Sequence, residues 1–201
     1  MDMAVLASGY GSNLQAIIDA VERGEIKGRI KTVISDVKDA YALERARHHN
    51  IEAIYINPRD YPGRKAFDEA IVALLEEKGI DLVILAGYMR LVSPVIIDKY
   101  RGKIMNIHPS LLPAFPGLEG VKQALDYGVK VSGCTVHFVD EGLDTGPIIL
   151  QEAVPVYDDD TVESLHERIH QAEHRLYPQA IRLFMEGKLR IEGRRCFRDE
   201  N

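Results

Sequence analysis

The sequence contains few cysteines, because only Cys134 and Cys196 occur in its 201 residues. The two lie far apart, without the short spacing that is typical of zinc ligands, and two cysteines cannot build a framework of several disulfides. The cysteine content therefore excludes a small disulfide-stapled fold. It favours a reducing, cytoplasmic location, and no cluster of residues predicts a metal site.

An excess of positive charge is also missing, since 25 Lys and Arg stand against 31 Asp and Glu, for a net charge of −6. Proteins that wrap nucleic acid normally carry a basic footprint, so we expect no nucleic-acid partner. The first apolar run has no basic leader and breaks at Ser8-Gly9, which is too early for a signal or membrane segment. We therefore expect small-molecule ligands and no membrane partner, and the sequence leaves the oligomeric state open.

Internal repeats, low-complexity linkers and shifts of composition are absent as well. A chain of 201 residues with 46% hydrophobic content is long enough to bury one sizeable core. We therefore predict a single domain that spans residues 1–201.

Short apolar runs that are typical of buried strands alternate with segments of helical periodicity. The expected strands cover residues 3–6, 30–34, 53–56, 82–86 and 104–107. Apolar stripes from Leu14 to Val21 and from Phe67 to Leu75 predict helices between them, and residues 39–50 predict a shorter one. This alternation predicts an α/β fold with a mainly parallel sheet and helices on both faces.

The pattern changes after Gly128. Residues 131–139 and 147–156 predict two strands without a helix between them, so we expect antiparallel neighbours in the C-terminal part. A closing helix is predicted to begin at Asp160 as its N-cap, with Glu163 three residues later, and to continue past Pro178. The basic segment 188–198 is predicted to lie at the surface.

The most informative motif is Asn106-Ile107-His108-Pro109, at the end of an expected strand. Side chains alternate along a strand, so Asn106 and His108 point the same way. Pro109 keeps the preceding residue extended. An amide beside a titratable donor is the minimum equipment for stabilising a developing oxyanion.

A candidate partner for this histidine is Asp144, in the acidic, glycine-punctuated loop of residues 140–146. A carboxylate there could hold the imidazole in its protonated form. Taken alone, an aspartate in such a loop is more often a turn residue. His137, on the preceding strand, is expected to be a sheet histidine with its hydrogen bonds satisfied.

Residues 8–13, Ser-Gly-Tyr-Gly-Ser-Asn, join the first strand to the first helix, and we name them the glycine loop. Glycines there let backbone amides approach a phosphate at a helix N-terminus, although a simple tight turn is equally compatible. A dinucleotide site is a further alternative, because Gly9 and Gly11 match its first two glycines and Asp36 could hold a ribose. Leu14 at the third small-residue position weakens that alternative.

Together these segments resemble the phosphoribosylglycinamide formyltransferase family, which are folate-dependent enzymes of purine synthesis. The matching pieces are residues 8–17, 43–46, 85–90, 106–113, 133–139, 144–149 and 173–178. Residues 106–110 and 144–147 also match other formyl-tetrahydrofolate enzymes, so another transferase or a hydrolase on the same core is the first alternative. A nicotinamide-dependent oxidoreductase and a non-enzymatic folate or nucleotide-binding module are the others.

The resemblance implies a Rossmann-like formyltransferase fold and a reaction. The formyl group of the cosubstrate 10-formyltetrahydrofolate would pass to the amino group of N1-(5-phospho-D-ribosyl)glycinamide, in de novo purine (IMP) biosynthesis. No metal takes part in the implied chemistry. Tyr10 and Glu119 depart from the family pattern, which often has a smaller polar residue at the first position and commonly histidine at the second.

The resemblance also implies roles for individual residues. Asn106, His108 and Asp144 match the catalytic set. The residues matching the ribonucleotide site are Gly11, Ser12, Asn13, His170 and Glu173. The residues matching the folate site are Arg64, Met89, Arg90, Leu91, Val92, Asn106, Asp140, Glu141, Gly142, Leu143 and Asp144.

Overall fold

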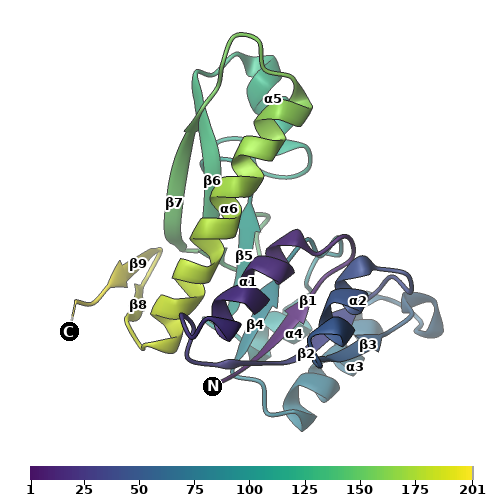
Figure 1. Ribbon diagram of the computed structural model, residues 1–201. Coiled ribbons are helices and arrows are strands. Elements are labelled where there is room, and N and C mark those ends of the chain that lie inside the picture. Colours follow the sequence, from purple (N-terminus) through teal and green to yellow (C-terminus); the bar gives the residue numbers. More distant parts are fainter. Residues whose placement is uncertain (201) are drawn as a thin grey trace. The chain divides into compact units, whose positions relative to one another are not determined.

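The computed structural model describes residues 1–200, as strands and helices that alternate through the first half of the chain (Figure 1). The chain divides into two compact units, Met1–Met105 and Asn106–Asn201. The single domain over residues 1–201 stays a prediction. Strand β5 (Ile104–His108) begins in the first unit and ends in the second.

The first unit is built on a parallel sheet. Its strands are β1 (Asp2–Leu6), β2 (Arg29–Ser35), β3 (Glu52–Tyr55), β4 (Leu82–Leu85) and the start of β5, in the order β3-β2-β1-β4-β5. Leu6 lies opposite Ile34 on one side and Leu85 on the other. The buried apolar residues of β1 and β4 suit strands that are covered on both faces. The predicted strands are confirmed, with ends that differ by about one residue.

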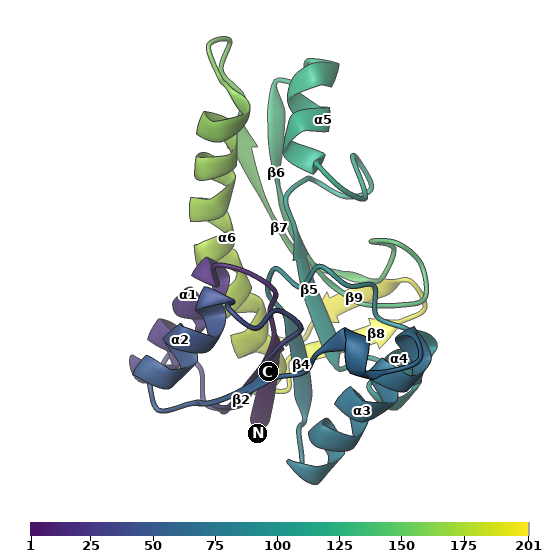
Figure 2. The same ribbon diagram turned by 90° about the vertical axis from the view of Figure 1, so that its right-hand side faces the viewer.

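Helices cover both faces of this parallel sheet. They are α1 (Ser12–Glu22), α2 (Tyr41–His48), α3 (Arg64–Glu77) and α4 (Pro94–Lys99), and a short 3₁₀ turn covers Pro58–Asp60. Figure 2 shows α1 and α2 on one side of the strands and α3 and α4 on the other. Leu14 and Ile17 of α1, and Phe67 and Ile71 of α3, are buried, as their helical spacing predicts.

The second unit contains an antiparallel pair, β6 (Val131–Phe138) and β7 (Ile148–Pro155). Helix α6 (Val162–Met185) packs along both strands (Figure 1), and its buried stripe includes Leu165, Ile169 and Leu176. The short helix α5 (Gly120–Tyr127) was not predicted from the sequence. The expected α/β class, with a mainly parallel sheet, helices on both faces and antiparallel strands in the C-terminal part, is confirmed.

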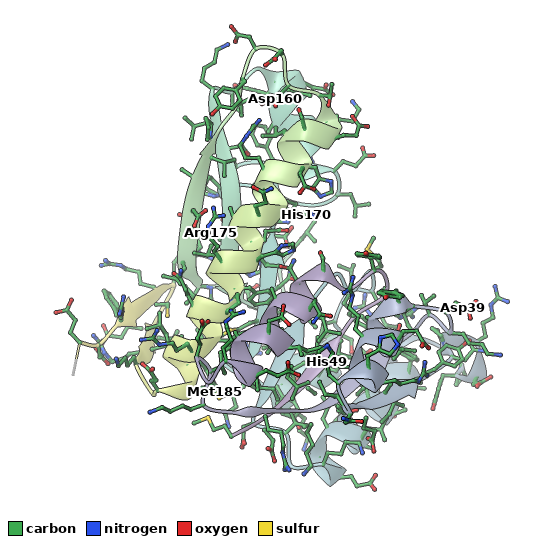
Figure 3. All side chains as sticks on the ribbon, in the orientation of Figure 1. Asp39, His49, Asp160, His170, Arg175 and Met185 are labelled. Atoms are coloured by element: carbon green, nitrogen blue, oxygen red, sulfur yellow. The ribbon has the colours of Figure 1, made fainter. Side chains whose placement is uncertain are left out.

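The predicted start of α6 was wrong by one residue. The N-cap is Thr161, whose side chain accepts a hydrogen bond of 3.1 Å from Ser164 N, while Ser164 Oγ accepts one of 2.9 Å from Thr161 N. Asp160 lies at the beginning of α6 in Figure 3, but its carboxylate is occupied by both terminal nitrogens of Arg168, each at 2.9 Å. The Asp160–Glu163 capping box therefore does not form.

The basic segment predicted at the surface is a hairpin of β8 (Leu189–Glu192) and β9 (Arg195–Arg198). Most of its residues are exposed, which confirms the surface location, while the strands themselves were not predicted. Within residues 1–200, no helix has the length and apolar content needed to cross a membrane.

Candidate active site

His108 is the last residue of β5 and is buried, and Asn106 lies two residues earlier on the same face of the strand. The Nε2 atom of His108 lies 2.8 Å from the carbonyl oxygen of Phe115. A carbonyl can only accept, so Nε2 carries a proton. The other ring nitrogen, Nδ1, lies 3.5 Å from Asp144 Oδ2. Both ring nitrogens thus face oxygen acceptors, an environment that suits an imidazolium.

The loop that presents the Phe115 carbonyl is held by two polar residues of the antiparallel pair. Thr135 Oγ1, on β6, donates to the carbonyl of Ser110 at 2.7 Å and accepts from Leu112 N at 3.1 Å. Gln151, on β7, donates to Thr135 Oγ1 at 3.0 Å and to the carbonyl of Leu112 at 2.9 Å. The sheet therefore fixes the loop that orients the histidine ring. Neither Thr135 nor Gln151 was predicted to take part.

Asp144 is held by backbone geometry. Its φ of 54° lies in the left-handed region, which aspartate tolerates better than most residues. Its Oδ2 atom accepts a hydrogen bond of 2.8 Å from Gly117 N. Gly146, two residues later, packs closely against the preceding strand. A Cβ at Gly146 would lie only 1.7 Å from the carbonyl oxygen of Phe138. The carboxylate is therefore held beside His108 by a closely packed loop.

His137 departs from its prediction. Its Nδ1 atom donates to the carbonyl of Phe138 at 2.8 Å, but its Nε2 atom is buried without a hydrogen-bond partner among residues 1–200, at 3.8 Å from Asp144 Oδ1. The prediction of a fully satisfied sheet histidine was therefore wrong for Nε2. Burial lowers the pKa of His137, although Asp144 opposes that shift. A second imidazole thus faces the carboxylate of Asp144.

His170 and Glu173 lie on α6, one helical turn apart, with His170 Nε2 at 3.7 Å from Glu173 Oε1. Figure 3 shows His170 partway along the helix, before Arg175. The glutamate side chain is only 5% exposed, whereas a helical glutamate is usually solvated. Burial lowers the pKa of His170, and the neighbouring His166 and His174 lower it further.

The glycine loop lies in the first unit, and its last two residues form the start of α1. Its Gly11 is the N-cap of α1 in the left-handed region, with φ of 80°, and no side chain caps the helix. Ser12 and Asn13, the first two residues of α1, are partly exposed. The first N–H groups of a helix have no partner within it, and they carry the positive end of its dipole. This arrangement can bind an anion such as a phosphate.

Ser8 connects the glycine loop to the segment after β4. Its Oγ atom donates to Asp36 Oδ1 at 2.6 Å and accepts from Met89 N at 2.9 Å. Its backbone N–H donates to the carbonyl of Gly87 at 3.0 Å. The loops after β1, β2 and β4 therefore meet at the carboxyl ends of the parallel strands, where ligands gather in sheets of this type.

The residues matching the folate site divide between the two units. Arg64, Met89, Arg90, Leu91 and Val92 belong to the first unit, and Asn106, Asp140, Glu141, Gly142, Leu143 and Asp144 belong to the second. In the first unit the apolar side chains of Met89 and Leu91 are 73% and 63% exposed, so their surface is open to contact with a ligand. An open cavity of about 440 Å³ in this unit is lined in part by Asp36, Tyr55 and Arg90.

Residues 1–200 contain no group of three or more His, Cys, Asp or Glu side chains that could hold a metal ion. The chemistry of the described groups is that of hydrogen bonding and proton transfer. A buried imidazole set between a carbonyl oxygen and a carboxylate oxygen, with an amide side chain two residues earlier on the same strand, supplies the donors that can stabilise a negatively charged oxygen.

This set of groups on an α/β sheet is typical of an enzyme that stabilises a negatively charged oxygen. Comparison with known proteins identifies its family. The family model described as Formyl transferase matches residues 1–181. The chain therefore belongs to the formyl transferase family.

Individual relatives are also similar over most of the chain. A solved structure of glycinamide ribonucleotide transformylase 1 from Symbiobacterium toebii is 57% identical, with a TM-score of 0.98 over 100% of this chain and 94% of that one. The phosphoribosylglycinamide formyltransferase of Bacillus subtilis is 45% identical over 89% of this chain and 92% of its own length.

A third relative is much longer. The trifunctional purine biosynthetic protein adenosine-3 of Chironomus tentans is 47% identical over 96% of this chain. The chain spans only 14% of the length of that relative, so it corresponds to one part of a larger protein there.

Proposed function

We propose that the protein transfers the formyl group of 10-formyltetrahydrofolate to the amino group of N1-(5-phospho-D-ribosyl)glycinamide, as a step of de novo purine biosynthesis. The main support is the 3.5 Å contact between His108 Nδ1 and Asp144 Oδ2. His108 lies on the same strand as Asn106. Membership of the formyl transferase family is consistent with this reaction.

In the proposed reaction the amino nitrogen of the ribonucleotide attacks the formyl carbon. A C–N bond forms and the carbonyl electron pair moves to oxygen, giving a tetrahedral intermediate with a negative oxygen. The intermediate collapses when the bond between the formyl carbon and folate N10 breaks. The attacking nitrogen loses one proton and N10 gains one, so the products are the formylated ribonucleotide and tetrahydrofolate.

Asn106 and His108 would stabilise the negative oxygen. The side-chain N–H of Asn106 donates one hydrogen bond, and Nδ1 of the protonated His108 donates another. Nδ1 is the ring nitrogen that can donate to the substrate. Nε2 already donates to the carbonyl of Phe115 at 2.8 Å, whereas the 3.5 Å from Nδ1 to Asp144 is too long for a strong hydrogen bond. Asp144 would stabilise the imidazolium charge and relay the proton lost by the amine, through water.

Two groups of residues match the ribonucleotide site of the family. The backbone amides of Gly11, Ser12 and Asn13 bind its phosphate, consistent with the uncapped start of α1. His170 and Glu173 bind the ribose and glycinamide, and the burial of Glu173 gives its carboxylate a fixed position for hydroxyl or amine donors.

The folate would contact Arg64, residues 89–92 and residues 140–144, which match the folate site of the family. The exposed side chains of Met89, Leu91 and Leu143 supply apolar surface for its rings. Arg64 at the start of α3 supplies a positive charge for its carboxylates.

The oxidoreductase alternative is disfavoured by one contact and by the burial of one side chain. Asp36, which would hold the ribose of a dinucleotide, accepts a hydrogen bond from Ser8. Leu14 is fully buried where a dinucleotide site needs a small residue. We further propose a cytoplasmic location without nucleic-acid or membrane partners, consistent with the net charge of −6 and with two free cysteines.

The test is an assay with 10-formyltetrahydrofolate, with and without the ribonucleotide, that measures formylated product and formate separately. We expect formylated product and tetrahydrofolate in equal amounts, and only when the ribonucleotide is present. Formate release that is independent of the ribonucleotide would indicate a hydrolase. Folate binding without either product would indicate a binding module, and both results contradict the proposal.

A further inference from the structure

We infer that Arg45 is a positioning residue, which holds the glycine loop in the shape that binds the substrate phosphate; this inference rests on the proposed function. Arg45 lies on α2 and its Nε atom donates to the carbonyl of Tyr10 at 2.8 Å. Its NH1 nitrogen donates to Gln15 Oε1 of α1 at 3.1 Å. One guanidinium therefore links the loop before the phosphate amides to the helix after them.

A second hydrogen bond from α2 also holds the glycine loop. Ala42 N donates to the carbonyl of Gly9 at 3.0 Å, so the carbonyls of both Gly9 and Tyr10 point toward α2. In a trans peptide the N–H points opposite to the C=O. The N–H groups of Tyr10 and Gly11 are thereby turned away from α2. The two contacts from α2 thus decide which way these backbone amides face.

Gly11 permits this close approach between loop and helix. A Cβ at Gly11 would lie 3.0 Å from Cα and Cβ of Ala42 and 3.3 Å from Cδ of Arg45. The loop is therefore seated directly on α2. A shift of the Arg45 side chain would remove part of the surface on which Gly11 rests.

Two tyrosines hold the guanidinium itself in place. The Tyr10 and Tyr41 rings stack with centroids 5.3 Å apart and an interplanar angle of 16°. The central carbon of the Arg45 guanidinium lies 4.5 Å from the Tyr10 centroid and 4.6 Å from the Tyr41 centroid, a cation–π arrangement. Tyr10 and Tyr41 are 69% and 42% exposed, so burial of the rings does not explain why they stack on each other and on Arg45.

The test compares Arg45→Met with Arg47→Met in steady-state kinetics. Arg47 lies on the same helix and forms an exposed ion pair with Glu44, so it is the matched control. Losing a hydrogen bond from a charged donor is expected to raise KM for the ribonucleotide about tenfold in Arg45→Met. The kcat and the KM for the folate should change less than about twofold, and the inhibition constant of inorganic phosphate should rise in parallel with the ribonucleotide KM.

Further variants separate geometry from charge and from folding. Arg45→Lys keeps the charge but loses the planar fork, so we expect its KM to stay raised. Tyr41→Phe keeps the ring and should behave as wild type, whereas Tyr41→Ala should raise KM for the ribonucleotide. The Tyr41 pair gives a result even if Arg45→Met fails to fold, which a melting temperature would reveal.

An unchanged ribonucleotide KM and phosphate inhibition constant in Arg45→Met would overturn the inference, as would full activity of Arg45→Lys. If wild type does not formylate the ribonucleotide, the proposed function fails on its own. Direct titration with inorganic phosphate would still compare Arg45→Met with wild type. Equal phosphate affinity in that titration would overturn the role of Arg45 separately.

Discussion

Asp144 Oδ2 lies 3.5 Å from His108 Nδ1 and accepts a hydrogen bond of 2.8 Å from the backbone of Gly117. The carboxylate side chain is only 10% exposed, and that of the histidine 7%. Charges shielded from water in this way interact more strongly than exposed ones. The pair can therefore hold an oriented imidazolium for a reaction that develops negative charge on oxygen.

Asp144→Asn keeps the size of the side chain and removes its charge. We expect kcat for formyl transfer to fall by about 10²- to 10³-fold, with little change in KM, because the imidazolium loses its counter-charge in the transition state. Steady-state kinetics at neutral pH provide the measurement. Asp158→Asn, at a side chain that is 95% exposed, is the control and should be unaffected. A similar kcat for both variants would argue against the role of Asp144.

Asn106→Ala removes the second proposed donor to the negative oxygen. Loss of one such donor typically raises the barrier by about 2.7 to 4 kcal/mol, so we expect kcat to fall about 10²- to 10³-fold. Binding of the folate, measured by fluorescence titration, should change far less than kcat. If affinity falls as much as turnover, Asn106 acts in ground-state binding instead.

Gly146→Ala should displace the loop that carries Asp144. The added methyl would lie 1.7 Å from the carbonyl oxygen of Phe138, which no side-chain rotation can relieve. We expect both a lower melting temperature and a lower kcat. Gly187→Ala is the control, because it has open space around it and carries only the strain of a φ of 69°, about 1–2 kcal/mol. A Gly146→Ala protein as stable and active as Gly187→Ala would contradict this view of the loop.

Stability should depend on pH through Asp160. The Arg168 guanidinium, together with the N–H of Tyr157, holds the pKa of Asp160 well below its usual range. A carboxyl whose pKa is lower in the folded state stabilises the protein above the unfolded-state pKa of about 3.9, and this stabilisation is lost as the pH falls below it.

Urea unfolding of wild type and Asp160→Asn between pH 3 and pH 7 measures this contribution. The deficit of the variant should be full above about pH 5 and shrink toward pH 3. Asp126→Asn is the comparison, because Asp126 forms an exposed ion pair with Lys122 and should show little deficit at any pH. A deficit for Asp160→Asn that does not vary with pH would contradict the assignment.

Features set by local periodicity were predictable from the sequence. The buried strands β1 and β4 follow from short apolar runs, and the stripes of α1 and α3 follow from helical spacing. The shared face of Asn106 and His108 follows from strand alternation, and the glycine loop from its position between a strand and a helix. Each of these needs information from only a few neighbouring residues.

Features with a weak local pattern, and features set by pairing between particular side chains, were not predictable. Helix α5 has only two buried apolar side chains, Val121 and Ala124, which is too weak a pattern to identify. The N-cap of α6 is Thr161, which exchanges hydrogen bonds with Ser164, while the Asp160 carboxylate pairs with Arg168, eight residues later. Within residues 1–200, His137 Nε2 has no hydrogen-bond partner, and its surroundings depend on a loop that returns beside its strand.

The most direct test of the account is the turnover of His108→Ala beside wild type, with both proposed substrates at saturation. In the proposed reaction the imidazole stabilises the negative oxygen of the tetrahedral intermediate. We therefore expect kcat for formyl transfer to fall by at least about 10²-fold while both substrates still bind. A His108→Ala enzyme that forms the formylated ribonucleotide at a nearly normal rate would contradict it.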